Sequence, residues 1–281
     1  MNIERFLELQ AEIKGIIGRS FLKAFKKNHA EFVLLMARGG YHKHLYLNNK
    51  DVTPFVLEDR EDFLMDLTRK KFFVRYVNDY IDRLKKGNIL SGDDLEYEIT
   101  TQLMIYSHIW ESHLFLNQLA RLAGIQQGKP YLWITKLPQG SKKNFITRQI
   151  IAEFKNTDED MRHLIEMCYS DAFRNAFAHS SYYIDNGRLQ PNKDMVFDGP
   201  SFSFEQWEEI FVRAVLLSYH LNDMLLEERN HFIEINGDGP IVIYMPMRNN
   251  HNDRRGVYIK PEPYDGKEEK VRFRYMQKGE I

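Results

Sequence analysis

Hydrophobic residues recur every three to four positions over roughly the first 230 residues, a spacing typical of amphipathic helices. The pattern predicts helices over residues 3–36, 63–84, 95–122, 146–154 and 204–228. Ser203 and Gln206 form a capping pair that predicts the start of the last of these helices. A further helix begins at the capping sequence Thr157-Asp158-Glu159-Asp160 and runs toward His179. Gly39-Gly40 ends the first helical stretch. Thr53-Pro54 predicts another helix start, because proline is favoured in the first turn.

The periodicity changes after residue 180. Residues 181–184 and 188–190 flank Asp185-Asn186-Gly187, and this arrangement predicts a β-hairpin with an Asn-Gly turn. The last fifty residues alternate between apolar and polar positions, which predicts short strands at 241–245, 256–259 and 271–275. Residues 126–144 contain glycine and proline and predict a loop. Within that loop, residues 131–134 form either a short buried strand or a packed segment.

These patterns predict a mainly α-helical chain in three regions. Residues 1–90 form an N-terminal helical region, 91–232 a helical domain with a hairpin, and 233–281 a small β-rich region. Hydrophobic residues make up 43% of the chain and charged residues 28%, which excludes global disorder.

The net charge of −1 shows no global basic excess of the kind that indicates a nucleic-acid-binding protein. The charge is uneven, however. Residues 1–50 hold nine Lys or Arg against four Asp or Glu, and residues 248–281 hold nine against six. Basic ends around an acidic middle can steer an anionic partner. Random variation of surface charge is the alternative explanation.

Cys168 is the only cysteine, so a disulfide within the chain and a cysteine-based zinc site are both excluded. This composition suits a reducing compartment. The first ten residues lack the apolar stretch of a signal peptide. No apolar run approaches the roughly 18 residues that a membrane span needs. We therefore expect a cytoplasmic protein with no membrane partner.

The segment 171–184 holds the most informative combination of side chains, namely Arg174, Asn175 and His179. Asn175 and His179 are four residues apart and share one helical face, whereas Arg174 points about 140° away from His179 on an ideal helix. An imidazole moves protons near neutral pH, and a guanidinium binds phosphate oxygens. The amide of Asn175 can hold a phosphate oxygen or orient the imidazole. No set of metal ligands lies nearby in sequence. The combination suits metal-free cleavage of RNA, in which the ribose 2′-OH is the nucleophile.

The sequence Arg174-Asn175-Ala176-Phe177-Ala178-His179 resembles the Arg-polar-x-x-x-His motif of the HEPN superfamily. The resemblance covers residues 91–232 and implies a HEPN-like helical bundle with the hairpin behind the motif helix. Many members are metal-independent endoribonucleases of toxin–antitoxin and phage-defence systems, and they dimerise through the motif helix. Arg174 and His179 match the catalytic pair, and Asn175 matches the polar position. The implied partners are RNA, a second copy of the chain, and an antitoxin or regulatory protein, with no cofactor and no metal.

One departure from the family pattern restricts what can be carried over. The subgroup paired with nucleotidyltransferase antitoxins has a tyrosine two residues after the histidine, where this chain has Ser181. Modification of that tyrosine is therefore not expected here, and the resemblance is to the nuclease type. We expect a substrate-binding surface that consists of Tyr182, Tyr183, Arg188 and His113.

Two alternatives compete with the nuclease hypothesis. In the first, Arg174 binds a carboxylate and His179 caps its helix, so that the segment has a purely structural role. In the second, a non-catalytic HEPN-like module uses the same surface to bind a nucleotide or a protein. An open basic cleft favours the nuclease, and a buried motif with Arg174 paired to an acid favours a scaffold.

Other histidines have simpler explanations. Tyr41-His42-Lys43-His44 could bind metal or RNA, but no third ligand is close in sequence, which favours an exposed polar loop. His108 and His113 lie near Glu111 on the predicted helix 95–122, five residues apart and poorly spaced for one ion. They either orient the motif helix or belong to the core.

The sequence leaves the roles of the aromatic and basic residues outside the motif open. Trp110, Trp133 and Trp207 are at positions expected for core residues. The C-terminal strands carry a set of basic residues with tyrosines between them: Arg254, Arg255, Arg272, Arg274 and Lys278, with Tyr258 and Tyr275. This set is compatible with RNA contact and equally with a sheet edge that is protected by charge.

Overall fold

The computed structural model describes residues 1–44, 53–134, 137, 142–191, 201–247, 253–277 and 280. It is mainly helical with small antiparallel sheets, so the predicted fold class is confirmed at that level. Lys278 and most of the polar segment after Tyr41 lie outside the described residues. No helix among the described residues is long and apolar enough to cross a membrane.

The N-terminal region begins with two helices, α1 (Ile3–Lys27) and α2 (His29–Met36). The prediction of one continuous helix was wrong, because Asn28 has an extended backbone and accepts the Glu31 N–H with its side chain. Asparagine at a helix N-cap satisfies an otherwise unpaired N–H. The helix start predicted at Thr53-Pro54 was also wrong: β2 (Phe55–Val56) follows and pairs antiparallel with β1 (Gly40–Tyr41).

The next three helices are α4 (Glu61–Lys86), α5 (Gly92–Glu111) and α6 (His113–Gln126). Gly87 closes α4 with a positive φ of 66°, a conformation that favours glycine. The predicted helix 95–122 is interrupted at Ser112, whose backbone is extended. The Ser112 hydroxyl accepts the Phe115 N–H at 3.1 Å and so begins a new helix.

The segment that leads to the motif is a series of short helices. They are α7 (Lys142–Asn144), a π-helix (Phe145–Ile151), α8 (Ala152–Phe154), α9 (Glu159–Cys168) and α10 (Asp171–Ala178). The helix predicted to run from residue 157 toward His179 is broken between Cys168 and Asp171. At the break, the buried Tyr106 hydroxyl donates to Cys168 O and accepts from Ser170 N. One side chain thus satisfies backbone groups that a continuous helix would pair.

The hairpin follows the motif helix as predicted. β3 (Tyr182–Asp185) and β4 (Arg188–Pro191) pair antiparallel, and Asn186 and Gly187 between them have φ of 49° and 69°. Two consecutive positive φ values are typical of the type I′ turn that Asn-Gly favours. A short third strand, β5 (Phe202–Ser203), pairs with β4. The residues 131–134 carry no strand and pack as an irregular segment.

The last part of the chain begins with α11 (Phe204–Asn230), which has the predicted capping box of Ser203 and Gln206. It continues with α12 (Phe232–Asn236) and the antiparallel strands β6 (Ile241–Pro246), β7 (Arg254–Pro263) and β8 (Val271–Tyr275). The three predicted C-terminal strands are therefore confirmed.

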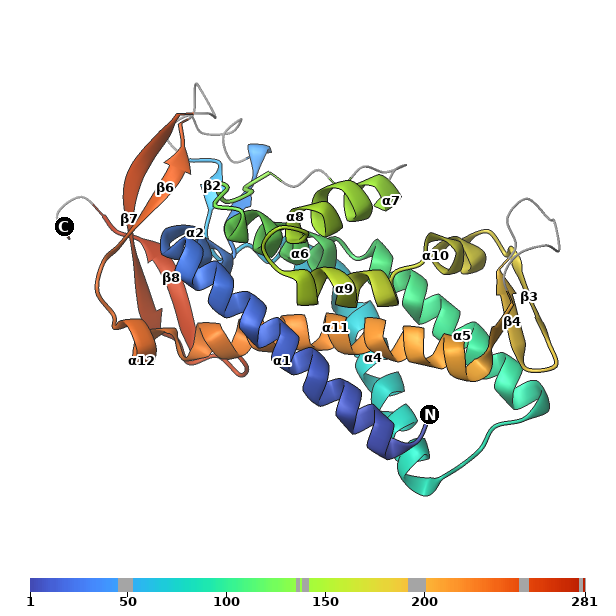
Figure 1. Ribbon diagram of the computed structural model, residues 1–281. Coiled ribbons are helices and arrows are strands. Elements are labelled where there is room, and N and C mark those ends of the chain that lie inside the picture. The colour runs from blue at the N-terminus through green and yellow to red at the C-terminus, as the bar shows by residue number, and fades with distance from the viewer. Residues whose placement is uncertain are drawn as a thin grey trace.

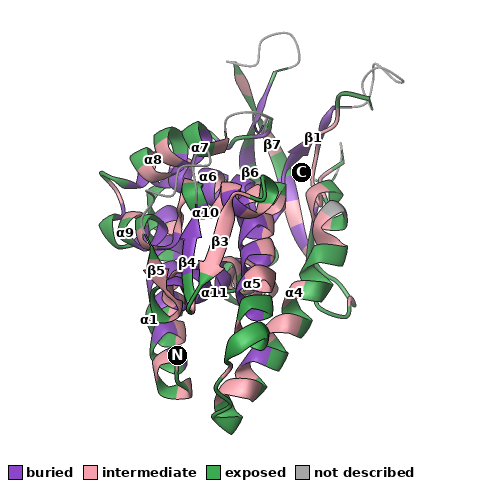
Figure 2. Ribbon diagram, turned by 90° about the vertical axis from the view of Figure 1, so that its right-hand side faces the viewer, coloured by how far each residue is buried: buried purple, intermediate pink, exposed green. Residues whose placement is uncertain are grey.

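Helix α11 runs along the length of the molecule, and different elements lie at its two ends (Figure 1). The hairpin β3–β4 and α10 lie at one end, and the sheet β6–β7–β8 lies at the other. Helices α1 and α5 pack along α11, and buried side chains from residues 6 to 273 form one core that crosses both predicted region boundaries. Helix α4 is mostly exposed (Figure 2), and Tyr80 is its only buried side chain among those described.

The histidine His220 on α11 makes stability depend on pH. It is 2% exposed, and burial lowers its pKa, although Asp223 and Glu227 nearby act in the opposite direction. The ring therefore binds a proton more weakly in the folded protein than in the unfolded chain, where an imidazole has its ordinary pKa of about 6.5. Since the unfolded state then binds more protons, stability falls as the pH drops through that range.

We expect His220→Gln to reduce this loss of stability. The measurement is the urea midpoint of wild type and variant at neutral pH and at about one and a half pH units below it. Equal losses of stability in the two proteins would contradict the assignment.

Candidate functional site

Arg174 is held by acidic side chains from two helices. Its Nη1 donates to Glu111 Oε1 on α5 at 2.7 Å, and its Nη2 donates to Asp171 Oδ1 at 2.9 Å. The side chain is 13% exposed. Ser107 on α5 fixes the motif backbone by donating to the Arg174 carbonyl oxygen at 3.0 Å. Arg174 therefore ties α10 to α5, and it is paired with carboxylates as the structural alternative requires.

Asn175 contacts the arginine rather than the histidine ring. Its Oδ1 accepts from Arg174 Nη2 at 3.1 Å. Its backbone oxygen accepts the N–H of His179, the C-cap residue of α10, at 3.0 Å. Among the described residues, no side-chain contact links Asn175 to the imidazole of His179, so the structure does not support the interpretation that Asn175 positions this ring. The amide orients Arg174 instead.

His179 lies at the end of α10 with its side chain exposed. No described residue forms a hydrogen bond or ion pair with the ring. Ser180 follows with a φ of 50°, and Ser181 N donates back to Ala176 O at 2.8 Å. This left-handed turn ends the helix and directs the chain into the hairpin. The imidazole is thus free to meet a ligand or a second chain.

Two lysines extend the charged cluster around the motif. Lys142 on α7 pairs with Glu111, and Lys143 Nζ lies 3.3 Å from Asp171 Oδ2. Each carboxylate is therefore shared between Arg174 and one lysine. Three cations face two carboxylates, and this leaves one positive charge that a phosphate group can neutralise. Neither lysine was predicted from the sequence as a site residue, because their only signal there is their position as a basic pair in a loop.

The other predicted substrate-binding residues are spread around the motif. The Tyr182 hydroxyl lies 3.5 Å from Thr100 Oγ1 on α5, and the Tyr183 hydroxyl donates to Gln190 Oε1 at 2.6 Å. Arg188 is exposed and donates to Ser201 Oγ and O. His113 is exposed at the first position of α6. Among the described residues, no hydrogen bond or ion pair joins these four side chains to His179, so their role in binding stays a prediction.

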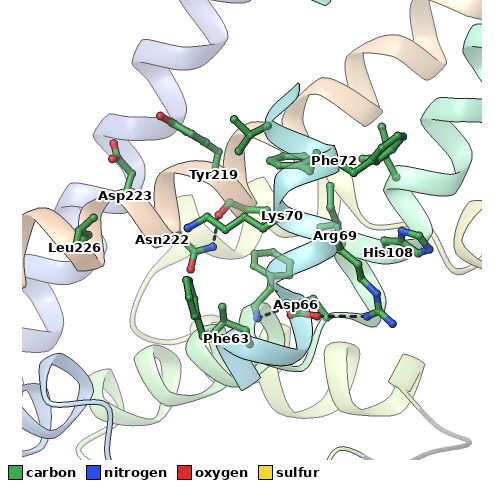
Figure 3. Close-up of a pocket in the computed structure, with 18 residues that line it drawn as sticks. Phe63, Asp66, Arg69, Lys70, Phe72, His108, Tyr219, Asn222, Asp223 and Leu226 are labelled. Atoms are coloured by element: carbon green, nitrogen blue, oxygen red, sulfur yellow. Dashed lines mark hydrogen bonds and ion pairs between the residues drawn. The ribbon is translucent and has the colours of Figure 1, made fainter. Parts of the chain in front are cut away.

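His108 points toward α4 and α11, and no hydrogen bond or ion pair among the described residues joins it to the motif helix. It lines a cavity of about 210 Å³ between α4, α5, α6 and α11. Figure 3 shows Phe63, Lys70 and Phe72 from α4 across from Tyr219 and Asn222 from α11. Burial is the main cause that lowers the pKa of His108, and Arg69 lowers it further.

The cavity has apolar walls and a polar rim. Phe72 and Tyr219 are 45% and 43% exposed at its edge. Arg69 pairs with Asp66 at 3.3 Å, and Lys70 lies 5.2 Å from the centre of the Phe63 ring. The sequence pattern placed the α4 aromatics in a helix but did not predict this space. Helical periodicity shows which face of a helix is apolar, but it does not show how closely a neighbouring helix packs on that face.

The basic residues of the C-terminal strands lie at the end of the molecule opposite to α10 (Figure 1). Arg254 pairs with Glu31 at 3.0 Å, and Arg274 pairs with Glu262 at 2.7 Å and with Glu280 at 2.8 Å. These pairings favour the explanation of a charged sheet edge over that of an RNA surface.

Cys168 is buried, and burial raises the pKa of its thiol, so the side chain is an inert part of the core. Comparisons of the chain with protein-family models, with curated proteins and with solved structures found no match. The resemblance to the HEPN superfamily rests on the motif residues and on the order of elements around them.

Proposed function

We propose that the chain is a metal-independent endoribonuclease of the HEPN type, with its site at the end of α10. The observation that carries this proposal is the shared pairing of Arg174, Lys142 and Lys143 with two carboxylates, beside the exposed His179. The order of elements also supports a HEPN-like bundle: α5 and α6, the short helices, α10, the hairpin and α11.

The pairing of Arg174 is compatible with phosphate binding because each of its carboxylates has a second cation. A phosphate that takes the place of Glu111 leaves that carboxylate paired with Lys142. A phosphate that takes the place of Asp171 leaves it paired with Lys143. Substrate binding then exchanges one charge-assisted hydrogen bond for another, and no buried charge is left unpaired.

The chemistry needs both a base and an acid. One imidazole removes the proton of the ribose 2′-OH, and the oxygen attacks the adjacent phosphorus. The bond from phosphorus to the 5′-oxygen breaks, and a second imidazolium gives that oxygen its proton. Arg174 stabilises the negative charge that develops on the phosphoryl oxygens. The products are a 2′,3′-cyclic phosphate and a 5′-hydroxyl.

A symmetric pair of chains would supply the second imidazole. One chain places a single histidine at the end of α10, and the exposed positions next to it are small or polar: Ala172, Ala178 and Ser180. A twofold contact between two α10 helices is self-complementary by symmetry and would bring two copies of His179 together.

A non-catalytic binding module is the second candidate. The burial of Arg174 between two acids favours a structural role for this residue, as expected for a scaffold, and so weighs against a motif that transfers protons. Such a module would bind RNA, a nucleotide or a protein at the same surface without transferring a proton. The test below separates the two functions by their products.

The proposal is tested with purified protein and a short single-stranded RNA in EDTA, next to the all-deoxy strand. We expect cleavage of the RNA alone, with cyclic-phosphate ends. RNA binding without cleavage would replace the nuclease by the binding module. A need for added magnesium, or cleavage of the deoxy strand, would contradict the mechanism because a metal-activated water does not depend on the 2′-OH.

The predicted dimer is tested in the same preparation. We expect Ala178→Cys to form an intermolecular disulfide, because this exposed residue lies on α10. Ile89→Cys, which is exposed far from α10, is the matched control. The native Cys168 is buried and does not interfere. Cross-linking at Ile89 but not at residue 178 would exclude a dimer through the motif helix.

A further inference from the structure

The end of β1 and the start of α4 bring together a histidine and two carboxylates. One potential ligand atom from each of His42, Asp59 and Glu61 lies within 4.8 Å of those of the other two. His42 Nε2 is 3.2 Å from Asp59 Oδ1, and His42 Nδ1 is 3.5 Å from Glu61 Oε2. The sequence lacked a third ligand near His42 and His44, and the fold supplies two from residues 17 and 19 positions later.

Backbone pairing between the two segments builds this cluster. His42 N donates to Pro54 O at 2.8 Å, and Asp59 N donates to Arg38 O at 3.1 Å. Gly40 allows the close approach, because a Cβ at this position would lie 1.9 Å from Asp59 Oδ2. Asp59 Oδ1 also accepts the Glu61 N–H at 3.0 Å in the first turn of α4. The histidine and both carboxylates are therefore positioned by elements on two sides.

The charge of the cluster calls for a cation. Among the described residues, no lysine or arginine pairs with Asp59 or Glu61. The arginines nearby are engaged elsewhere: Arg38 and Arg60 both pair with Glu269. Two carboxylates thus face only the imidazole of His42, and the local charge is negative whether or not that ring is protonated.

We propose that His42, Asp59 and Glu61 form a binding site for a divalent transition-metal ion, with Zn²⁺ as the best fit. Zinc takes imidazole and carboxylate ligands at about 2.0–2.2 Å, and three protein ligands plus water make a common tetrahedral set. Ligand atoms around such an ion lie about 3.3–3.6 Å apart. The separation of 3.2 Å between His42 Nε2 and Asp59 Oδ1 needs only a small adjustment. Glu61 Oε2 lies nearest the other ring nitrogen, so this exposed side chain must rotate toward Nε2 to join the same ion.

The ligand set also predicts selectivity. Mg²⁺ and Ca²⁺ prefer a larger number of ligands, all of them oxygen atoms. Here, one of the three protein ligands is an imidazole nitrogen. The site lies beside β1, which Figure 2 places away from α10. The neighbouring strand β2 reaches the C-terminal sheet, where the Tyr275 hydroxyl donates to Phe55 O. The ion would fasten the first turn of α4 to β1, and Tyr80 is the one buried side chain of α4 among those described. The site is independent of the proposed RNA cleavage and departs from the expectation of a metal-free chain.

The test is titration of the full-length protein, stripped with EDTA, with ZnCl₂ by calorimetry. We expect one tight site per chain, much weaker binding of Mg²⁺ and Ca²⁺, and slower hydrogen exchange in the first turn of α4 when zinc is bound. His42→Ala should weaken zinc binding by more than about 100-fold, since loss of a mere outer-shell partner costs 10–100-fold.

Two further variants make the result specific. Asp59→Asn keeps the oxygen that accepts the Glu61 N–H but removes the charge, and it should weaken zinc binding without lowering the melting temperature in EDTA. His163→Ala removes an exposed histidine on α9 and should leave binding unchanged. Zinc affinity that is equal in wild type and His42→Ala, or the absence of binding at micromolar zinc, would overturn the site.

Discussion

We expect His179→Ala to lower the rate of RNA cleavage by about two to four orders of magnitude, the usual contribution of general acid–base catalysis. In the proposed mechanism this ring moves a proton in each chain of the dimer. The variant should fold normally, because the side chain is exposed and forms no hydrogen bond with a described residue. The measurement is the single-turnover rate on a short RNA in EDTA, together with the melting temperature.

Matched variants on α9 separate catalysis from a general loss of charge. His163→Ala removes another exposed histidine and should retain full activity. Arg174→Ala should lose cleavage, whereas Arg162→Ala, which removes an arginine paired with Glu159 and Glu166, should not. Full cleavage by His179→Ala, or equal loss in His163→Ala, would remove His179 from the mechanism.

Replacement of Arg229 by methionine should cause the largest loss of stability, about 3–5 kcal/mol, as is typical when one partner of a buried ion pair is removed. Arg229 on α11 is fully buried. Its guanidinium donates to Met36 O and Val271 O, both at 2.7 Å, and pairs with Glu58. The change leaves Met36 O and Val271 O without this donor and leaves the Glu58 carboxylate with the Phe273 N–H but without its cation, at the junction of α2, α11 and β8.

The free energy of unfolding from urea titration measures this effect. Arg274→Met, which removes an arginine from the exposed pairs with Glu262 and Glu280, should have a much smaller effect. Glu58→Gln should lower the free energy of unfolding less in the Arg229→Met background than in wild type, because the two side chains interact directly. Similar losses for Arg229→Met and Arg274→Met would show that the buried contacts do not stabilise the junction.

Local sequence signals predicted those features that depend on neighbours in the chain. The Asn186-Gly187 turn and the Ser203–Gln206 capping box are present because each satisfies its backbone requirement within a few residues. Alternation likewise identified the C-terminal strands. Hydrophobic periodicity failed at Asn28, Ser112 and Ser170, where a polar side chain caps a new helix inside a continuous apolar pattern. These three residues are N-cap types, so the signal was present but was outweighed by the periodicity.

The residues of the motif could be identified from the sequence, but the residues that surround them in space could not. The sequence placed Arg174, Asn175 and His179 at a helix end, and they lie there. Glu111, which holds Arg174, is 63 positions away, and the lysines that share the two carboxylates come from α7. Contacts between residues so far apart depend on how helices pack, and no spacing rule along the chain contains that information.

The sequence by itself determined the helical class, the hairpin, the terminal strands and the identity of the motif residues, because propensity, capping and alternation act over a few residues. Only the tertiary structure decided that Arg174 is paired with acids while His179 is exposed, and that His108 lines a cavity instead of supporting the motif. It also decided that His42 meets Asp59 and Glu61. Each of these depends on side chains from separate elements, and their approach is set by the packing of the core.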